Sequence, residues 1–486
     1  MAMRDEGSWH GSSLVSWAVG GSLLISGCNL APPYRRPGLE MACQWRFSLE
    51  EKGCYYEDEL YWWKLFGDPQ LDDYMAEALL FNRELKMAAA RVAQFYERVL
   101  IARSELYPQV DVHGRGLRNE LSLKTNMLPD GAARIFNFFT FFFQAAYELD
   151  FWGRIRNQAA AAYGDWKAST EDRRTVILSL VSSVATSYLF LKQLWAQHAI
   201  AQETVASRKN SYELAVVRFE EGLSSELVVE QAASELYASE AAVVEFEREI
   251  GLQEDLLSVL LGRMPTAVER GIALKKLEEP PCLPEGLPSS LLGKRPDLRS
   301  AEWALYASGA RVGEAKAALF PNIRLTGLFG YESTQLKDLF KPDSRTWSYG
   351  GEFIESLFTG GRLLARVGEA HAVRAELYYR YQLAVQKAFA EVEDALIRYK
   401  KSRELLKVRE KGVKALEAYL KLATLQYEDG LIDYLNVLDA QRELFQGQLA
   451  YLDALGESFI SIAQVYKALG GSWVCAAEKI ADLQRY

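Results

Sequence analysis

Histidine, proline and metal-binding motifs are scarce in this chain. Its 486 residues include only four histidines and 14 prolines. No Cys-x-x-Cys or His-x-x-x-His spacing occurs, so the sequence predicts no zinc site. A P-loop and a Gly-x-Ser-x-Gly motif are also absent, and the fragment Gly114-Arg115-Gly116 lacks the third glycine of a dinucleotide-binding turn. These absences argue against an enzyme, a metal centre and a cofactor site.

An excess of positive charge is missing as well. Lysine and arginine number 56 against 65 aspartates and glutamates, and the resulting net charge of -9 argues against a nucleic-acid binder. Hydrophobic residues make up 49% and charged residues 25% of the chain. That balance excludes both a disordered chain and an ordinary multi-span membrane protein.

The first part of the chain has the composition of a targeting segment. No Asp, Glu, Lys or Arg occurs between Gly7 and Tyr34, and the apolar run Leu14–Ile25 is too short to span a bilayer but long enough for a signal-peptide core. The run leads into Leu24–Cys28, which resembles a bacterial lipobox. The resemblance implies cleavage before Cys28, a covalent lipid on Cys28 and sorting to the outer membrane. The alternative is a plain signal peptide with an incidental cysteine.

An internal duplication organises the remainder. Val217–Leu236 superposes on Leu425–Leu444 without gaps at a shift of 208 positions, and eight of these twenty positions are identical. A second match pairs Leu106–Val110 with Leu319–Ile323. Two matches in the same order indicate an internal repeat.

Long proline-free segments between these matches carry a coiled-coil period. Apolar residues recur at alternating steps of four and three over 177–219 and again over 385–427, which is typical of helices that supercoil on their neighbours. The proline-free stretch from Ile155 to Phe219 predicts a helix of roughly 100 Å, at about 1.5 Å per residue. Gly222 and Gly430 each follow such a helix, so each is predicted to be a left-handed cap at the tip of a helical hairpin.

Four strand-like patches lie between the helical segments, at about 109–117, 135–150, 322–331 and 347–358. Each is near the length of a tilted transmembrane strand. The second patch is very aromatic; its phenylalanines are Phe136, Phe138, Phe139, Phe141, Phe142 and Phe143. Lipid-exposed strands persist only in closed barrels, and the smallest outer-membrane barrels have about eight strands. Four strands cannot close alone, so the chain must oligomerise; the alternative is a pair of hairpins packed on a soluble core.

Several motifs resemble those of outer-membrane efflux proteins. They are the lipobox, Trp63–Leu71, Tyr147–Arg154, Arg295–Arg299 with Ala318–Pro321, and Tyr434–Arg442. With them the chain is similar, over residues 28–473, to the NodT/OprM lipoprotein branch of the TolC-like family. The resemblance implies a mixed α+β membrane protein. Its trimer would join a twelve-stranded β-barrel, four strands from each chain, to a long coiled-coil α-helical barrel.

The same resemblance implies a function, partners and a location. The chain would be the exit duct of a tripartite efflux system, not an enzyme. It would passively conduct substrates from an inner-membrane pump of the resistance-nodulation-division type through a periplasmic adaptor. It would sit in the outer membrane with a long periplasmic portion. A type I secretion outlet of the same fold and a coiled-coil scaffold lipoprotein without a pore remain as alternatives, although a scaffold has no use for an exposed phenylalanine cluster.

The chain accordingly divides into five parts. They are a signal peptide (1–27), a lipidated extended segment with the equatorial start (28–75), the first repeat (76–294), the second repeat (295–473) and a C-terminal tail (474–486).

The hairpin tips supply the candidate site residues. Predicted adaptor contacts are Gly222, Leu223, Ser224, Gly430, Leu431 and Ile432. The resemblance also implies a periplasmic aperture, for which the candidates are Asp433, Asp429 and Arg218. Symmetry-related copies of one aspartate would form an acidic ring, and Arg218 from the other hairpin would tie the tips shut. Which aspartate points inward stays open, because Asp433 aligns with Ser225 and both are predicted helix N-caps, worth about 1 kcal/mol each.

Cys28 is expected to be the first residue of the mature protein and to carry the lipid. Mass spectrometry of the mature N-terminal peptide should therefore find Cys28 with an acylated mass. An unmodified mature N-terminus at any other residue would contradict the lipobox assignment.

Overall fold

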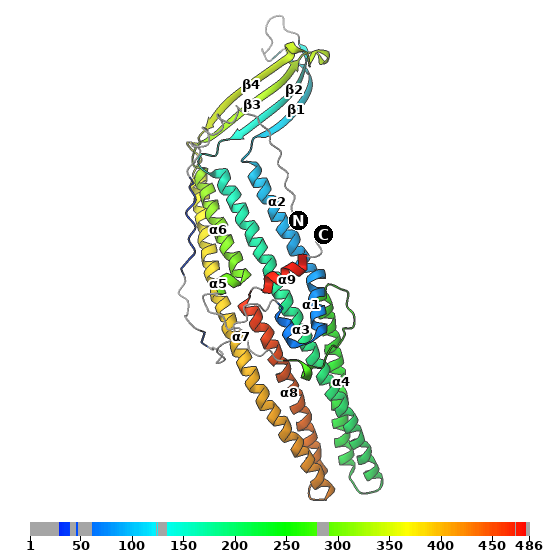
Figure 1. Cartoon of the computed structure of the whole chain (residues 1–486). Helices are drawn as coiled ribbons and strands as arrows, with labels where there is room; N and C mark the ends of the chain where they lie inside the picture. The colour runs from blue at the N-terminus through cyan, green and yellow to red at the C-terminus, as the bar shows by residue number, and fades with distance from the viewer. Residues whose placement is uncertain are drawn as a thin grey trace, which may run out of the picture. The chain divides into compact units, whose positions relative to one another are not determined.

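The computed structural model describes residues 29–38, 45–46, 61–122, 124, 134–278, 291–471 and 473–482. The predicted signal peptide and Cys28 lie outside these residues. The described helices and strands are η1 (Trp62–Phe66), α1 (Pro69–Phe81), α2 (Arg83–Ser104), β1 (Gln109–Glu120), β2 (Ile135–Glu148), α3 (Arg154–Glu220), α4 (Glu226–Leu261), η2 (Leu274–Lys276), α5 (Leu291–Lys294), α6 (Pro296–Ala317), β3 (Asn322–Ser333), η4 (Leu336–Asp338), η5 (Pro342–Ser344), β4 (Arg345–Ile354), α7 (Arg362–Glu428), α8 (Tyr434–Leu469) and α9 (Trp473–Asp482) (Figure 1).

Two compact units make up the described chain. The sheet unit contains Ala93–Lys167 and Glu302–Arg380 together with the described residues up to Pro37. The hairpin unit contains the described residues of Gly38–Val92, Ala168–Ala301 and Tyr381–Tyr486.

The duplication predicted from the sequence is confirmed by the elements. Helices α3 and α7 are each 67 residues long, and helices α4 and α8 are each 36 residues long. Gly222 and Gly430 separate the members of each pair with φ of 72° and 74°. Both glycines are therefore left-handed caps, as expected.

The sheet unit holds one antiparallel sheet with the strand order β1-β2-β3-β4. The predicted patches coincide with the four strands, but the fourth strand is Arg345–Ile354. Residues 355–358 of the patch thus lie beyond it. Strands β1 and β4 are the two edges of this sheet, so their outer backbone groups face away from the other described strands.

The two faces of the sheet differ in polarity. Strand pairing places Phe143 opposite Phe329, and Phe329 opposite Trp347, so these aromatic side chains share one face. The exposed large apolar residues of this face are Val110, Val112, Ile135, Phe143, Leu325, Phe329, Trp347, Tyr349 and Phe353. Positions of the opposite face include Asp111, Arg115, Thr140, Gln144, Arg324, Thr326, Ser348 and Glu352.

The phenylalanine cluster of β2 is divided between these faces. Side chains alternate along a strand, so Phe139, Phe141 and Phe143 lie on the aromatic face and Phe136, Phe138 and Phe142 on the polar one. The cluster therefore does not form one continuous surface, although its members are close together in the sequence. The physical reason is the period of two, which no strand can avoid.

The core of the hairpin unit gathers aromatic residues from both ends of the chain. Trp62 of η1 stacks on Tyr466 of α8, with ring centroids 4.9 Å apart and planes 8° apart. Trp473 of α9 meets both Trp62 and Trp63 edge to face. The segment predicted as a C-terminal tail thus begins with a buried helix, and Arg173 of α3 pairs with its Glu478 and Asp482 at 3.2 and 2.7 Å.

A buried ion pair explains the Trp63–Leu71 motif. The Asp68 carboxylate caps α1 by accepting the Gln70 N–H at 3.1 Å and accepts the Tyr188 hydroxyl at 2.9 Å. It also lies 2.7 Å from the Lys192 ammonium, and both side chains are almost fully buried. Burial lowers the pKa of Lys192, while Asp68 opposes that shift. One carboxylate therefore holds α1 against α3.

The Tyr147–Arg154 motif has a comparable structural role in the sheet unit. Asp150 accepts the backbone N–H groups of Ile155 and Arg156 at 3.2 and 2.8 Å, which satisfies the start of α3. The Trp152 ring donates to the Pro321 carbonyl oxygen at 3.0 Å and stacks on Phe320 at 4.7 Å. The motif thus joins the two repeats where their strands meet their helices.

Removing the charge of Asp68 should destabilise the hairpin unit. Asp68→Asn keeps the size and an acceptor but leaves the Lys192 ammonium buried without a counter-charge, which costs about 3 kcal/mol or more. The thermal midpoint of the helical circular-dichroism signal in detergent should fall clearly. The double variant Asp68→Asn with Lys192→Met should regain most of the loss. A double variant as unstable as the single one would show that the ion pair is not the cause.

Candidate functional site

The two hairpin tips form the same turn. At the first tip the Gly222 N–H donates to the Phe219 carbonyl at 2.9 Å and the Leu223 N–H donates to the Arg218 carbonyl at 2.7 Å. At the second tip Gly430 and Leu431 repeat this pattern at 3.0 and 2.8 Å. Only a left-handed glycine lets both bonds form without strain. The repeated loop signature therefore has a backbone cause.

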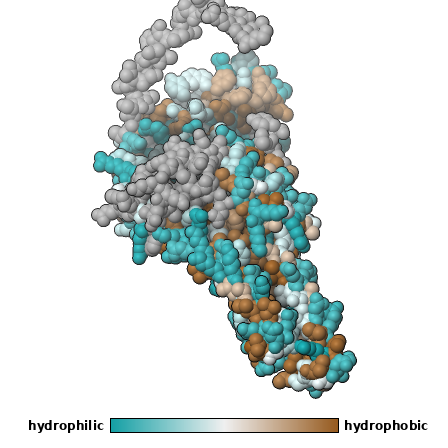
Figure 2. Space-filling model, turned by 60° about the horizontal axis from the view of Figure 1, so that its bottom comes forward, coloured by the Kyte–Doolittle hydropathy of each residue, from teal (hydrophilic) through white to brown (hydrophobic). Residues whose placement is uncertain are grey.

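A leucine side chain projects from each tip. Leu223 is 75% exposed and Leu431 is 72% exposed, and Leu227 and Leu435 lie exposed one turn further on. Figure 2 shows apolar surface among polar surface at the end of the hairpins. Ile432 differs, because it packs with Tyr427 and Tyr434 beside the small buried cluster of Ala423, Val437 and Ala440. The tips thus present paired apolar groups of equivalent geometry.

The first and second tips are joined by an arginine and a tyrosine. Arg218 of α3 donates a hydrogen bond to the Tyr427 hydroxyl of α7, and its guanidinium lies 5.2 Å from the centre of that ring. The centre of the Tyr434 ring lies 5.1 Å from the centre of the Tyr427 ring. The hydrogen bond fixes the orientation of the guanidinium relative to the Tyr427 hydroxyl, and the cation–π contact adds electrostatic attraction to the ring.

The acidic residues of the tips lie outside this link. Asp429 and Asp433 are both exposed. Asp433 occupies the N-cap position of α8, and Ser225 occupies that of α4, but neither side chain makes the expected capping hydrogen bond. The N-cap interpretation is therefore right about position and wrong about the side-chain bond. Arg218 reaches Tyr427 rather than either aspartate.

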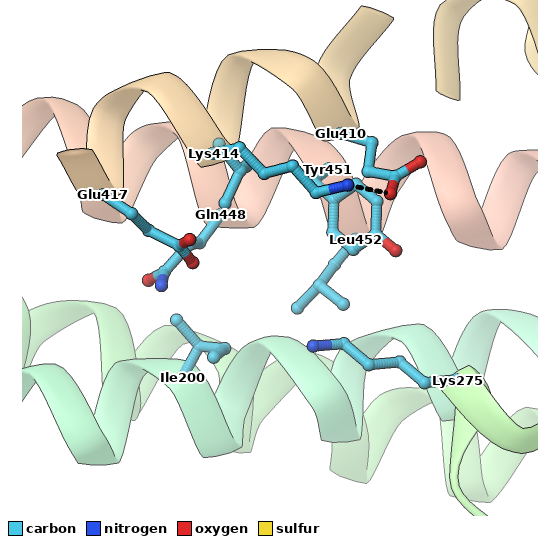
Figure 3. Close-up of a pocket in the computed structure, with 9 residues that line it drawn as sticks. Ile200, Lys275, Glu410, Lys414, Glu417, Gln448, Tyr451 and Leu452 are labelled. Atoms are coloured by element: carbon cyan, nitrogen blue, oxygen red, sulfur yellow. Dashed lines mark hydrogen bonds and ion pairs between the residues drawn. The ribbon is translucent and has the colours of Figure 1, made fainter. Parts of the chain in front are cut away.

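A groove lies higher in the hairpin unit, between the two hairpins. Figure 3 shows its lining, and its cavity volume is about 230 Å³. The lining residues come from α3, η2, α7 and α8 and are Ile200, Lys275, Glu410, Val413, Lys414, Glu417, Gln448, Tyr451 and Leu452. The Lys414 ammonium pairs with the Glu410 carboxylate at 2.7 Å. Their hydrogen bond lowers the pKa of Glu410 and raises that of Lys414, so both stay charged near neutral pH and neither is poised for proton transfer.

Comparison with known proteins identifies the family to which this architecture belongs. The family model for outer membrane efflux proteins matches residues 75–263 and 287–471. The chain belongs to the outer membrane efflux protein family. It is an outer-membrane channel of an efflux system and not an enzyme, which decides between the efflux function and the two alternatives that the sequence left open.

Relatives and solved structures agree along nearly the whole length of this efflux channel. It is 32% identical over 460 residues to the cation efflux system protein CusC of Escherichia coli O6:H1, covering 93% of this chain and 97% of that one. It is 33% identical over 459 residues to the toluene efflux pump outer membrane protein TtgI of Pseudomonas putida, with the same two shares. The crystal structure of the Campylobacter jejuni CmeC outer membrane channel matches with a TM-score of 0.87 and 25% identity, covering 93% and 98% of the two chains.

The residue that Arg218 contacts was not among the candidates at the tips. Tyr427 is the last residue of the apolar period over 385–427, and its hydroxyl is the acceptor for Arg218. Its counterpart in the first repeat is Phe219, at the shift of 208 positions. Tyr427 has a hydroxyl that Phe219 lacks, and this difference is the sequence feature that could have pointed to the contact with Arg218.

Proposed function

We propose that three copies of this efflux channel form a passive exit duct, which receives substrates from an inner-membrane pump through a periplasmic adaptor. The observation that carries this proposal is the four-stranded sheet with two open edges and two unlike faces. Edge backbone groups in lipid must find partners, so β1 of one copy would pair with β4 of the next. The aromatic face would then contact lipid, and the polar face would line a water-filled interior.

The tips are proposed as the periplasmic end, where the adaptor docks. Leu223 and Leu431 offer equivalent apolar contacts, with Gly222, Ser224, Gly430 and Ile432 shaping the surface around them. Two equivalent turns in each chain would present six similar contacts in a trimer, which suits an adaptor that binds as a repeated hairpin. Docking there would act directly on the helices that close the aperture.

The aperture is proposed to combine an acidic ring with a restraint. Three copies of Asp433 or Asp429 would favour cations at the constriction. Arg218 would restrain the second hairpin through Tyr427, because moving α7 away from α3 breaks both the hydrogen bond and the ring contact. Opening therefore requires the adaptor to replace this link.

The covalent lipid at Cys28 is proposed as an additional anchor in the outer membrane. A closed barrel holds itself in the bilayer, so the lipid would assist placement and is not required for retention. The names of two relatives that are similar to this chain to nearly the same degree refer to cation efflux and to toluene efflux. Selection of cargo is therefore assigned to the pump and not to the duct.

The trimer has a direct test in its mass. Three mature chains of a 54.8 kDa precursor should give a particle of about 160 kDa in mild detergent, after the detergent is subtracted. Light scattering with simultaneous absorbance measures this mass. A stable monomer that retains its full β-sheet signal would rule the trimer out.

The aperture has its test in planar bilayers. Arg218→Ala should raise single-channel conductance by releasing α7, and Asp433→Asn should change the conductance and reduce its preference for cations by removing the charge of the acidic ring. Tyr427→Phe keeps the ring contact but loses the hydroxyl acceptor, so its conductance should lie between wild type and Arg218→Ala. If Arg218→Ala and Asp433→Asn both conduct like wild type, then the constriction lies elsewhere in the channel.

A further inference from the structure

The N-terminal strap, residues 29–37, lies along helix α6 of the sheet unit (dark blue in Figure 1). One contact is very close, because a Cβ atom on Gly313 of α6 would lie only 2.6 Å from the Cβ atom of Ala31. At the other contact Glu302 of α6 accepts the Tyr34 hydroxyl at 2.8 Å and the Arg36 Nε–H at 2.9 Å. The strap is therefore held to α6 at two places, roughly three helical turns apart.

Between these two places a cavity lies beneath the strap. A Cβ atom added to Gly309, which lies between Glu302 and Gly313 on α6, would meet no atom of another element within 4 Å. The cavity has a volume of about 610 Å³, and its walls come from the strap, α3, α6 and α7. It is therefore large enough for a small molecule and is formed within one chain.

Cationic and aromatic side chains line this cavity. Four tyrosine rings are in its walls, among them Tyr306 and Tyr379, and none of the described residues that line it is acidic. The basic lining residues are Arg35, Arg36, Arg374 and His371. The whole chain has a net charge of -9, so a cavity without a carboxylate departs from its average composition. Charges of one sign in a recess attract a group of the opposite sign.

Two of these cations have no counter-ion in the part of the chain that the structure describes. Arg36 is paired with Glu302. Arg35 of the strap and Arg374 of α7 form no ion pair or hydrogen bond with any described residue. An anion in the cavity would interact with both guanidinium groups, and the surrounding walls would strengthen that attraction by excluding water.

A buried amide with an unused donor lines the same cavity. Asn157, in the first turn of α3, is only 3% exposed. Its side-chain Nδ2 has no hydrogen-bond partner among the described residues. Buried donors in folded proteins normally have an acceptor, and leaving one unsatisfied is destabilising. A phosphate or carboxylate oxygen of a ligand would supply the acceptor that the protein does not.

We propose that this cavity binds an amphiphilic anion. Its phosphate or carboxylate group would contact Arg374, Arg35 and the Asn157 amide, because guanidinium and amide N–H groups donate strongly to such oxygens. Its apolar body would lie against the tyrosine and proline side chains. A phospholipid of the outer membrane and a soluble organic anion both have this chemistry. The bound anion would join the strap to α3 and α7, a role that goes beyond the conduction of substrates.

Binding is measured by isothermal titration calorimetry with the full-length channel in a neutral detergent. The probes are dioctanoyl phosphatidylglycerol, phenyl phosphate, inorganic phosphate and dioctanoyl phosphatidylcholine, which has no net charge. Phosphatidylglycerol or phenyl phosphate should bind once per chain, about tenfold or more tightly than inorganic phosphate and phosphatidylcholine. A preference for phosphatidylglycerol would assign the site to a membrane lipid, and a preference for phenyl phosphate would assign it to a soluble anion.

Three variants test the residues that form the site. Arg374→Gln removes one cation, Asn157→Leu removes the buried donor at similar size, and Gly309→Leu fills the cavity from α6. Each should weaken binding about tenfold or more. Without ligand, Asn157→Leu and Gly309→Leu should unfold at or above the wild-type temperature, since one removes an unsatisfied donor and the other removes a glycine from a helix. Arg380→Gln is the matched control, because Arg380 is an exposed arginine of α7 outside the lining, and it should bind like wild type.

Two results would overturn the site. If phosphatidylglycerol and phenyl phosphate both bind no more tightly than phosphatidylcholine and inorganic phosphate, then the cavity does not select an amphiphilic anion. If the three variants bind the preferred probe like wild type, then the probe binds elsewhere. Neither result bears on the proposed trimer or on the exit duct, because the cavity is complete within the sheet unit of one chain.

Discussion

Unpaired backbone groups at the two edges of the sheet are the constraint on which the rest of the structure depends. Strands β1 and β4 end the order of four strands, and all of their large exposed apolar residues except Ile354 sit on one face. A lipid environment supplies no hydrogen-bond partners for such edges, so the strands can be inserted into the membrane only if their edges are paired with other strands. The proposed trimer meets this requirement by pairing each edge with a neighbouring copy.

The motifs by which the chain resembles its family hold its elements together and perform no chemistry. Asp68 joins the start of α1 to Tyr188 and Lys192, and Asp150 satisfies the start of α3. Trp152 bonds Pro321 across the two repeats. A duct needs rigid walls and a movable end, which is consistent with buried ion pairs in the core and a lighter Arg218–Tyr427 link at the tips. Function in this protein therefore follows from the shape of the channel and from the contrast between a rigid core and more weakly linked tips.

Much of the candidate site could be predicted from the sequence, and there are physical reasons why the remaining features could not. The tips were predictable because a glycine after a long helix has one common conformation, and both glycines adopt it. The capping bonds of Ser225 and Asp433 were not, since residue type gives a preference and the local turn decides whether the side chain reaches the backbone. The partner of Arg218 depends on the packing of α3 against α7, which joins residues 209 positions apart.

The sequence by itself determined the local and repeated features of this protein. Periodicity, glycine positions and the internal repeat specify two long hairpins and four strands, because each depends on backbone geometry within a few residues. Only the tertiary structure decided which side of each element meets another, as in the division of the β2 phenylalanines between two faces and the packing of the C-terminal helix α9 against Trp62 and Trp63. Those outcomes depend on pairing register and long-range packing, in which residues distant in the chain compete for the same surface.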